Sequence, residues 1–210
     1  MTRKALTLAA LVVAGVAAQP AIAQETDAGT TEVSSNGTSF RGIRIEGNIG
    51  GDRFQSQGDH HGKFGFGGAV GFDGMIGDRF VVGAEATFWK PGSGNENCNP
   101  LPTGQRVCHK AFQEWGAAVR AGVMATPDLL VFAKAGYVNG EQRFRIDSPT
   151  GAVQVYDHYR ADGYQLGAGV EYTVRQSSVP VYVSAQYVYS NYHGHTSRGR
   201  IMGGVGIRFK

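Results

Sequence analysis

The sequence has few of the residues that define several common classes of protein. It contains two cysteines and seven prolines in 210 residues, too few for a disulfide-rich scaffold or a proline-rich disordered chain. No segment reaches the ~20 consecutive apolar residues that a membrane-spanning helix needs. An excess of one charge is also missing, because 20 basic residues face 17 acidic ones. The composition therefore gives no sign of a nucleic-acid partner.

The first 23 residues have the layout of a secretory signal peptide. Arg3 and Lys4 precede an apolar core, and residues 21–23, Ala-Ile-Ala, form a small-residue cleavage site. Without this segment the formal charge falls from +3 to +1, since 18 basic residues then face 17 acidic ones. Residues 24–40 are polar and rich in Ser, Thr and Gly, which predicts a flexible periplasmic leader before a folded domain at residues 41–210.

Cys98 and Cys108 are the only cysteines in the chain. Because an exported chain meets an oxidising compartment, we expect them to form one disulfide. The segment between them contains Pro100, Pro102 and Gly104, so the bond is expected to hold a loop. By the entropy of loop closure, the bond should raise the free energy of unfolding by roughly 2–3 kcal/mol.

Glycine is abundant, with 32 residues, about twice the usual frequency of ~7%. There is no Gly-X-Y repeat, and the glycines fall in segments where apolar and polar residues alternate. Alternation with a period of two predicts β-strands. Eight such segments are present, at residues 42–54, 64–76, 80–89, 112–124, 129–138, 164–174, 181–190 and 199–209.

The connections between these strands alternate in length. Residues 77–79, 125–128 and 175–180 are short turns, whereas residues 55–63, 90–111, 139–163 and 191–198 are longer and polar. Short turns at one rim and long loops at the other are typical of outer-membrane barrels. The sequence therefore predicts an all-β fold, an eight-stranded antiparallel transmembrane up-and-down β-barrel with short periplasmic turns and long extracellular loops.

The two faces of the predicted strands differ sharply. One face is apolar and free of charge, as at Ile43, Ile45 and Ile49, which suits contact with lipid. Aromatic residues near both ends of this face predict two interfacial girdles. The opposite face carries eight charged residues that would line the interior, four basic and four acidic: Arg44, Glu46, Glu85, Glu114, Arg120, Lys134, Glu171 and Arg208.

These interior charges support two interpretations. A mutual network of opposite charges would fill the narrow interior of an eight-stranded barrel as a structural plug. The same residues could instead line a narrow or gated channel. A net charge of zero favours the plug, and we expect Glu85, Arg120 and Lys134 at its centre because they lie on consecutive strands.

Several of these segments resemble a known family. The export signal, the segments FVVGAEATFWK (80–90) and RAGVMATPDLLVFAKAGYV (120–138), and a final strand ending VGIRF are similar to the small eight-stranded outer-membrane β-barrel proteins of Gram-negative bacteria. This is the opacity-protein and surface-antigen group, which is porin-like and related to the membrane domain of the major structural outer-membrane protein. The resemblance covers about residues 40–209 and concerns the fold more than any activity.

The resemblance implies a location and two partners. The protein would lie in the bacterial cell outer membrane, in contact with its lipid. Val205, Ile207 and Phe209 match the C-terminal signal that the barrel-assembly machinery binds during biogenesis. Lys210, which follows the terminal phenylalanine, is a departure from that signal.

All six histidines fall in the predicted extracellular loops. His60, His61, His193 and His195 could converge at the barrel mouth as a surface site for zinc, copper or haem. The sequence shows no fixed partner that would orient these rings. We therefore expect polar loop residues, with no metal or other cofactor.

An enzymatic role is the other class of function to test. The lipid A deacylase family of barrels carries a His-x-Ser-Asn element on a late strand. Ser190 and Asn191 match the end of this element, but Val188 stands where the histidine belongs. Without that base the serine hydroxyl is not activated, so we expect no enzyme.

The longest predicted loop has strand signals of its own. Residues 143–146 and 152–159 flank a turn at residues 147–151, which predicts a hairpin that continues two strands above the membrane. Such a ribbon could act as an adhesive edge. We therefore expect a structural or surface-interaction protein, adhesin- or antigen-like, whose loops are candidates for binding an extracellular ligand. The alternatives are a narrow porin-like channel, a metal- or haem-binding receptor and a lipid A-modifying enzyme.

Overall fold

A computed structural model describes residues 40–56, 59–92, 96–193 and 196–209, without the side chains of residues 59–61. The predicted signal peptide and all but the last residue of the predicted leader lie outside these ranges. Within them, no helix has the length and apolar character needed to cross a membrane.

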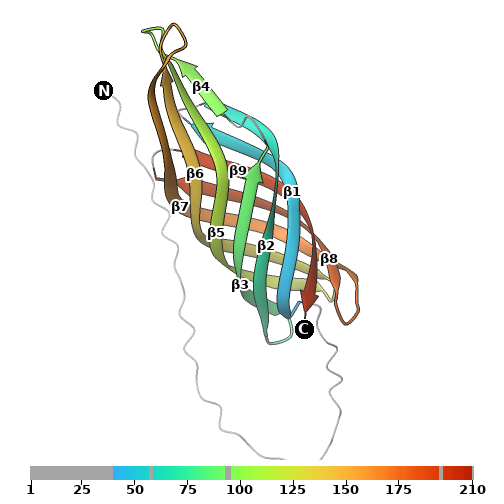
Figure 1. Cartoon of the computed structure of the whole chain (residues 1–210). Helices are drawn as coiled ribbons and strands as arrows, with labels where there is room; N and C mark the ends of the chain where they lie inside the picture. Colours follow the sequence, from blue (N-terminus) through green and yellow to red (C-terminus); the bar gives the residue numbers. More distant parts are fainter. Residues whose placement is uncertain (1–39, 57–58, 93–95, 194–195, 210) are drawn as a thin grey trace, which may run out of the picture. The chain divides into compact units, whose positions relative to one another are not determined.

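Nine strands form one antiparallel sheet (Figure 1). They are β1 (Gly42–Ser56), β2 (Asp59–Ile76), β3 (Phe80–Pro91), β4 (Glu96–Pro100), β5 (Arg106–Thr126), β6 (Leu129–Asp147), β7 (Val153–Arg175), β8 (Val181–Tyr192) and β9 (Thr196–Phe209). β1 pairs with both β2 and β9, and β3 pairs with β5. Eight strands thus close into a ring in which each strand pairs with its neighbours, and β4 lies outside it. The all-β, eight-stranded antiparallel barrel predicted from the alternation is confirmed.

The predicted loops were too long, because the strands continue through much of them. β2 already begins at Asp59, β6 runs to Asp147, and β7 starts at Val153. Four histidines that we placed in loops, at positions 60, 61, 109 and 158, therefore lie on strands. The alternation of apolar and polar residues fades in these extensions because polar residues also occupy buried positions there, such as Gln142.

The hairpin predicted within the longest loop is confirmed. β6 and β7 stay paired from Leu129 and Tyr172 up to Asp147 and Val153. Their tip is closed by a hydrogen bond from the Ser148 backbone nitrogen to the Ala152 oxygen at 2.7 Å. Gly151 at this tip has φ +86°, a left-handed conformation that glycine adopts without strain.

One strand was missed. β4 pairs with the start of β5, and Cys98 lies directly opposite Cys108. The predicted disulfide joins them, with a Cα–Cα distance of 4.1 Å. The bond therefore ties a short edge strand to the sheet rather than holding an irregular loop.

The outward and inward faces follow the predicted alternation. The apolar side chains assigned to the outer face are widely exposed, including Ile201 at 72%, Val119 at 66% and Phe64 at 63%. The inward positions alternate with them and are buried, so β1 carries alternating buried and exposed residues over its whole length. The molecule thus has its polar side chains inside and an apolar belt outside.

Phe40 is the first residue that the structure describes. Its side chain is fully buried against Val81, Leu130 and Phe132, and the Arg208 guanidinium lies 5.4 Å from its ring centre. This residue, the last of the leader predicted from sequence, therefore packs inside the turn end of the barrel.

Candidate functional site

Twelve charged side chains are buried among the residues that the structure describes, six basic and six acidic. The eight interior residues predicted from sequence are all in this set, and the other four are Asp52, Asp73, Arg198 and Arg200. Asp52, Asp73 and Arg200 occupy positions that face inward in their predicted strands, so the alternation alone could have identified them. Arg198 was assigned to a loop and could not be placed by parity.

The larger group lies toward the turn end. Arg44 binds three carboxylates: Glu46 at 3.6 Å, Asp73 at 3.3 Å, and Glu85. Arg208 donates to Asp73 at 3.0 Å and to Glu171 at 2.6 Å. With the remaining members Arg120 and Lys134, four cations face four carboxylates in this cluster.

The expected centre of the network is only partly assembled. Lys134 lies 2.7 Å from Glu85, so two of the three residues meet. Arg120 instead forms ion pairs with Glu171 at 2.9 Å and with Asp73 at 3.4 Å. Asp73, which bridges Arg44, Arg120 and Arg208, holds the position that we had assigned to Glu85.

A second, smaller cluster lies toward the loop end. Glu114 accepts from Arg200 at 2.6 Å, lies 3.6 Å from Arg198, and also accepts from Tyr192. Arg198 reaches Asp52 at 3.2 Å. Two cations again face two carboxylates, so this cluster is also neutral.

A small apolar group lies between the two clusters inside the barrel, beside the polar side chains of Asn48, Gln165 and Gln186. Trp89, Val188 and Met202 form a buried group, which we call the collar. Trp89 is fixed on the loop-end side, because its indole nitrogen donates to Asp52 at 2.9 Å and the Arg200 guanidinium lies 5.7 Å from its ring. The cavity beside the collar measures about 20 Å³, room for about one water molecule.

Pairing is what makes these buried charges tolerable. A buried charge without a partner costs several kcal/mol, and opposite charges with hydrogen bonds offset that cost. The glycines opposite the large side chains make the room for them. At Gly204, for example, a Cβ atom would lie 2.4 Å from Asn48 and 2.7 Å from Glu46. The interior is therefore filled by side chains rather than open.

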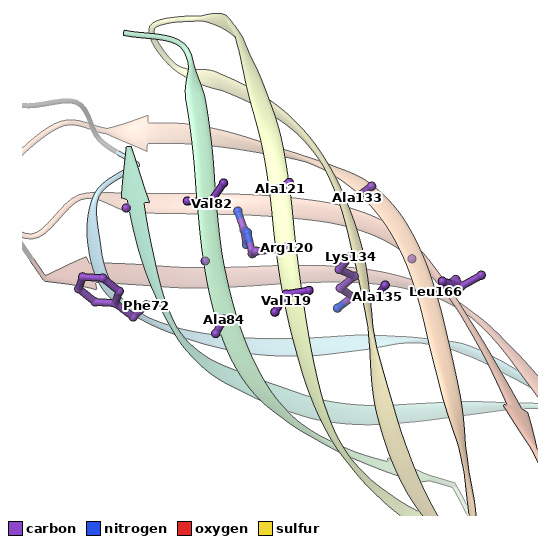
Figure 2. A pocket seen from close by; sticks show the side chains of 13 residues that line it. Phe72, Val82, Ala84, Val119, Arg120, Ala121, Ala133, Lys134, Ala135 and Leu166 are labelled. Atoms are coloured by element: carbon purple, nitrogen blue, oxygen red, sulfur yellow. The ribbon is translucent and has the colours of Figure 1, made fainter. Parts of the chain in front are cut away.

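The outer surface carries an apolar groove. Its volume is about 930 Å³, and its lining residues come from β2, β3, β5, β6 and β7 (Figure 2). Arg120 and Lys134 belong to the strands that line it, but their charged ends are buried in the ion pairs described above. The side chains that face outward here are apolar: Phe72, Val82, Ala84, Val119, Ala121, Ala133, Ala135 and Leu166.

Above the ring, β4 and the ends of β5, β6 and β7 form a four-stranded sheet, which we call the loop-end sheet (Figure 1). Two of its basic residues are paired with carboxylates. Arg143 contacts Glu96 at 2.6 Å, and Arg145 contacts Asp147 at 3.1 Å. β7 pairs with β8 only from Gly163 onward. Between Val153 and Ala161, the described part of the chain gives β7 a partner on one side only.

The candidate metal and catalytic residues lie only partly within the described chain. His60, His61 and His195 have side chains outside the described residues. His193 is described, and its Nδ1 lies 2.9 Å from the Asp162 backbone oxygen. The only cluster of potential metal ligands among the described residues is Glu96, Cys98 and Cys108, and both cysteines are bound in the disulfide.

Ser190 lies inside the barrel rather than at its surface. Its side chain is fully buried, accepts a hydrogen bond from Arg200 at 2.7 Å, and lies 3.4 Å from a carboxylate oxygen of Glu114. Val188, two residues earlier, belongs to the collar. The serine is thus a member of the loop-end cluster.

The predicted assembly signal lies on the outer face of the last strand. Val205 and Phe209 are 61% and 40% exposed, and Ile207 is partly exposed between β1 and β8. Lys210 lies outside the described residues. The recognition itself stays a prediction.

Comparisons with known proteins agree on the fold. The outer membrane protein β-barrel domain family matches residues 7–209, whereas curated proteins give no match. Among solved structures, Ail, the attachment invasion locus protein of Yersinia pestis, has a TM-score of 0.54 at 15% identity, over 80% of this chain and 99% of that one. That structure is a complex with the heparin analogue sucrose octasulfate.

Two further solved barrels are similar over nearly their whole length. Neisserial surface protein A is 15% identical, with a TM-score of 0.48, over 80% of this chain and 97% of that one. The N-terminal β-barrel domain of Pseudomonas aeruginosa OprF is 14% identical, with a TM-score of 0.46, over 79% and 97%. The family match spans nearly all of the sequence, and the closed ring has the apolar belt that such a barrel requires. The chain therefore belongs to the outer membrane protein β-barrel domain family, and the protein is a transmembrane barrel of the bacterial outer membrane.

Proposed function

We propose that the protein is a closed barrel that presents the loop-end sheet to the cell exterior as a surface for protein partners. The observation that carries this proposal is the free edge of β7 from Val153 to Ala161, which pairs only with β6 among the described strands. The barrel anchors this edge in the membrane. The interior ion pairs and the collar keep the anchor rigid and closed.

An unpaired strand edge is a template for another strand, since it offers a row of backbone donors and acceptors. Natural proteins usually blunt such edges with proline, bulges or a covering segment. The β7 edge has no proline, and its irregularity in pairing with β6 is confined to the tip at Asp147. The edge is therefore available over most of its length.

The side chains along the edge suit a partly apolar partner. Val153, Val155 and Tyr156 are 56%, 44% and 59% exposed, a concentration of apolar surface that is unusual above a membrane. Charged residues follow at Asp157 and Arg160 and would favour a defined register over unspecific association. We therefore propose an extended polypeptide segment as the partner.

A polyanion such as the ligand of Ail is a less suitable partner for this sheet. Its central cations, Arg143 and Arg145, are already paired with Glu96 and Asp147. A bound polyanion would have to displace these carboxylates. Backbone pairing along β7 requires no such displacement.

We also propose that the barrel is neither a channel nor an enzyme. The clusters are neutral, and the space beside the collar is filled to a cavity of about 20 Å³, which supports the absence of conductance. Ser190 is fully buried between Arg200 and Glu114 inside the barrel, away from the lipid that a hydrolase of this type would cleave, which supports the absence of hydrolase activity.

The test of the edge is a selection of random peptides displayed on phage against the refolded protein in micelles. Hydrogen exchange is then measured with and without a synthetic copy of the recovered peptide. We expect slower exchange at residues 153–161. Two proline variants serve as matched probes, Val155→Pro with Asp157→Pro, and Gln154→Pro with Tyr156→Pro, because alternate residues of an edge strand direct their N–H groups outward.

One of the two proline pairs should abolish peptide binding while the barrel stays folded, as judged by its shifted gel migration without heating. The other pair disturbs the contact with β6 and reports on hairpin stability. Protection confined to other loops, or recovered peptides that bind both variants as well as the parent, would contradict edge pairing.

A further inference from the structure

A hollow of about 570 Å³ opens on the outer wall of the barrel near its extracellular end. It is lined by residues of β1, β2, β8 and β9, namely Gly51, Asp52, Arg53, Gly62, Lys63, Phe64, Tyr187, Gly199 and Ile201. This volume is within the ~300–1,000 Å³ of small-molecule sites. Neither the closed interior nor the β7 edge accounts for it.

The floor of the hollow is made of glycine. In the sheet, Arg53 on β1 lies between Gly62 on β2 and Gly199 on β9. One step deeper, Gly51 lies between Phe64 and Ile201. Gly62 and Gly199 thus flank Arg53 at one level, and Gly51 lies at the next level down between Phe64 and Ile201, which are 63% and 72% exposed and form the walls.

The glycines are not required by tight packing. A Cβ atom at Gly51 would meet nothing within 4 Å, and one at Gly62 would meet only the Asp52 backbone oxygen at 4.0 Å. At Gly199 the nearest atom is the Tyr187 hydroxyl oxygen at 3.0 Å, so this tyrosine lies across the glycine. The space is open to a ligand, and the phenol hydroxyl borders it as a hydrogen-bond donor.

Two cations stand at the upper rim of the hollow without a carboxylate. Arg53 and Lys63 are exposed, and among the described side chains neither takes part in an ion pair. Asp52, the one acidic residue of the lining, is fully buried and directs its carboxylate inward to Arg198 and Trp89. In the loop-end sheet, by contrast, Arg143 and Arg145 have acidic partners.

The hollow lies at the level of the lipid headgroups in the membrane. Phe64 and Tyr187 belong to the extracellular aromatic girdle, which marks the boundary between the hydrocarbon core and the polar headgroups. Arg53 lies two residues above Gly51, on the polar side of that boundary. Cations at this level attract anionic headgroups, and the apolar walls below them suit an acyl chain.

We propose that this hollow binds a phosphorylated glycolipid of the outer leaflet, of the lipid A type. A phosphate contacts Arg53 and Lys63, and an acyl chain lies on the glycine floor between Phe64 and Ile201. The bound lipid comes from the outer leaflet, because the hollow opens at the extracellular end of the barrel. The predicted contact with membrane lipid thereby becomes a defined site on one side of the barrel.

The experiment measures lipid binding by native mass spectrometry on the protein refolded in micelles of an uncharged detergent. The probes are bisphosphorylated hexa-acyl lipid A, the same lipid without its phosphates, and phosphatidylglycerol. Arg53→Gln with Lys63→Gln removes the cations, and Gly51→Leu fills the floor. The matched control for the latter is Gly47→Leu, on the same face of β1, where a Cβ atom also meets nothing within 4 Å.

We expect lipid A to bind about tenfold more weakly to the Arg53 and Lys63 variant, as for the loss of charge-assisted hydrogen bonds. Gly51→Leu should weaken binding to a similar degree, and Gly47→Leu should bind like the parent. Gel migration verifies folding of each variant, and the charge variant keeps the test valid if Gly51→Leu does not fold. Equal binding by parent and variants, or equal binding of lipid A with and without phosphate, would overturn the proposal. Phosphatidylglycerol bound as tightly as lipid A would overturn the assignment to a glycolipid.

Discussion

Lys134 on β6 donates a hydrogen bond of 2.7 Å to Glu85 on β3, across the intervening strand β5. The other oxygen of the same carboxylate binds Arg44. One buried carboxylate thus neutralises two cations from opposite sides of the interior. Its removal leaves Arg44 with Glu46 and Asp73 but leaves Lys134 without a carboxylate among the ion pairs of the described residues.

Glu85→Ala should therefore lower the free energy of unfolding by about 3–5 kcal/mol, the cost of leaving a buried charge uncompensated. The measurement is a urea titration of the barrel refolded into lipid vesicles, followed by tryptophan fluorescence. Glu141→Ala is the matched control. Glu141 pairs with His158 in the partly exposed loop-end sheet, where a pair contributes about 0–1 kcal/mol.

A double-mutant cycle separates the pair from the rest of the cluster. In the Glu85→Ala background, Lys134→Ala should cost much less than in the parent protein, since the lysine has already lost its partner. Independent, additive effects of the two substitutions would show that Lys134 and Glu85 do not act together.

The collar leads to a prediction about conductance. The parent protein should give no current steps in a planar bilayer. Trp89→Ala with Met202→Ala removes most of the apolar group between the two charged clusters and should produce steps, because water can then connect the polar groups. Val82→Ala with Leu166→Ala is the control, because it removes apolar volume from the outer face and should stay silent.

Stable steps in the parent protein would contradict the closed barrel and favour the narrow channel. A collar variant that is folded yet silent would show that the charged clusters alone block the path. Gel migration and circular dichroism identify any variant that has failed to fold.

The sequence predicted most of the ring because lipid and a narrow interior each impose a strict rule on alternate residues. Outward positions such as Val119 had to be apolar, and inward neighbours such as Arg120 had to find room and a partner. The alternation also places Asp52, Asp73 and Arg200 on the inward face. The partners themselves could not be predicted, because they depend on register: Arg120 meets Asp73 and Glu171 rather than Glu85.

Above the membrane the same rules no longer hold. The extended strands carry polar residues at inward as well as outward positions, so residues such as Gln142, which is buried, and His158 give no alternating signal. β4 has only five residues, and its sequence ENCNP has the composition of a loop. Its place in the sheet depends on pairing across the disulfide, which the spacing of Cys98 and Cys108 indicated without revealing the strand.

The disulfide gives a local prediction. Cys98→Ser with Cys108→Ser should release β4, because this strand pairs only with β5 within the part of the chain that the structure describes. Hydrogen exchange at Glu96–Pro100 should accelerate by about 30- to 160-fold, which corresponds to the roughly 2–3 kcal/mol of loop-closure entropy. Exchange in β8 and β9 is the internal control and should not change. Slower refolding or loss of the whole barrel would contradict a purely local role.

His109 on β5 predicts a pH dependence for the loop-end sheet. It lies between Asn97 on β4 and Phe144 on β6, and its ring centre is 5.0 Å from that of Phe144. Neither ring nitrogen has a hydrogen-bond partner within the described chain. Burial accordingly lowers the pKa of the His109 imidazole below its usual 6.5, because the charged form loses its hydration.

A histidine whose pKa falls on folding contributes most to stability above its unfolded pKa, where both states are neutral. The contribution is lost as the pH drops through 6.5 toward the folded value, since the unfolded strand then binds a proton that the folded sheet excludes. Amide exchange in β4 and the start of β5 should therefore indicate weaker protection at pH 5.5 than at pH 7.5, after correction for intrinsic exchange rates. His109→Phe should remove this difference, with His158→Gln present in both proteins so that the His158–Glu141 pair makes no contribution. Equal protection at the two pH values in the protein that retains His109, or a difference that persists in His109→Phe, would show that this imidazole does not control the sheet.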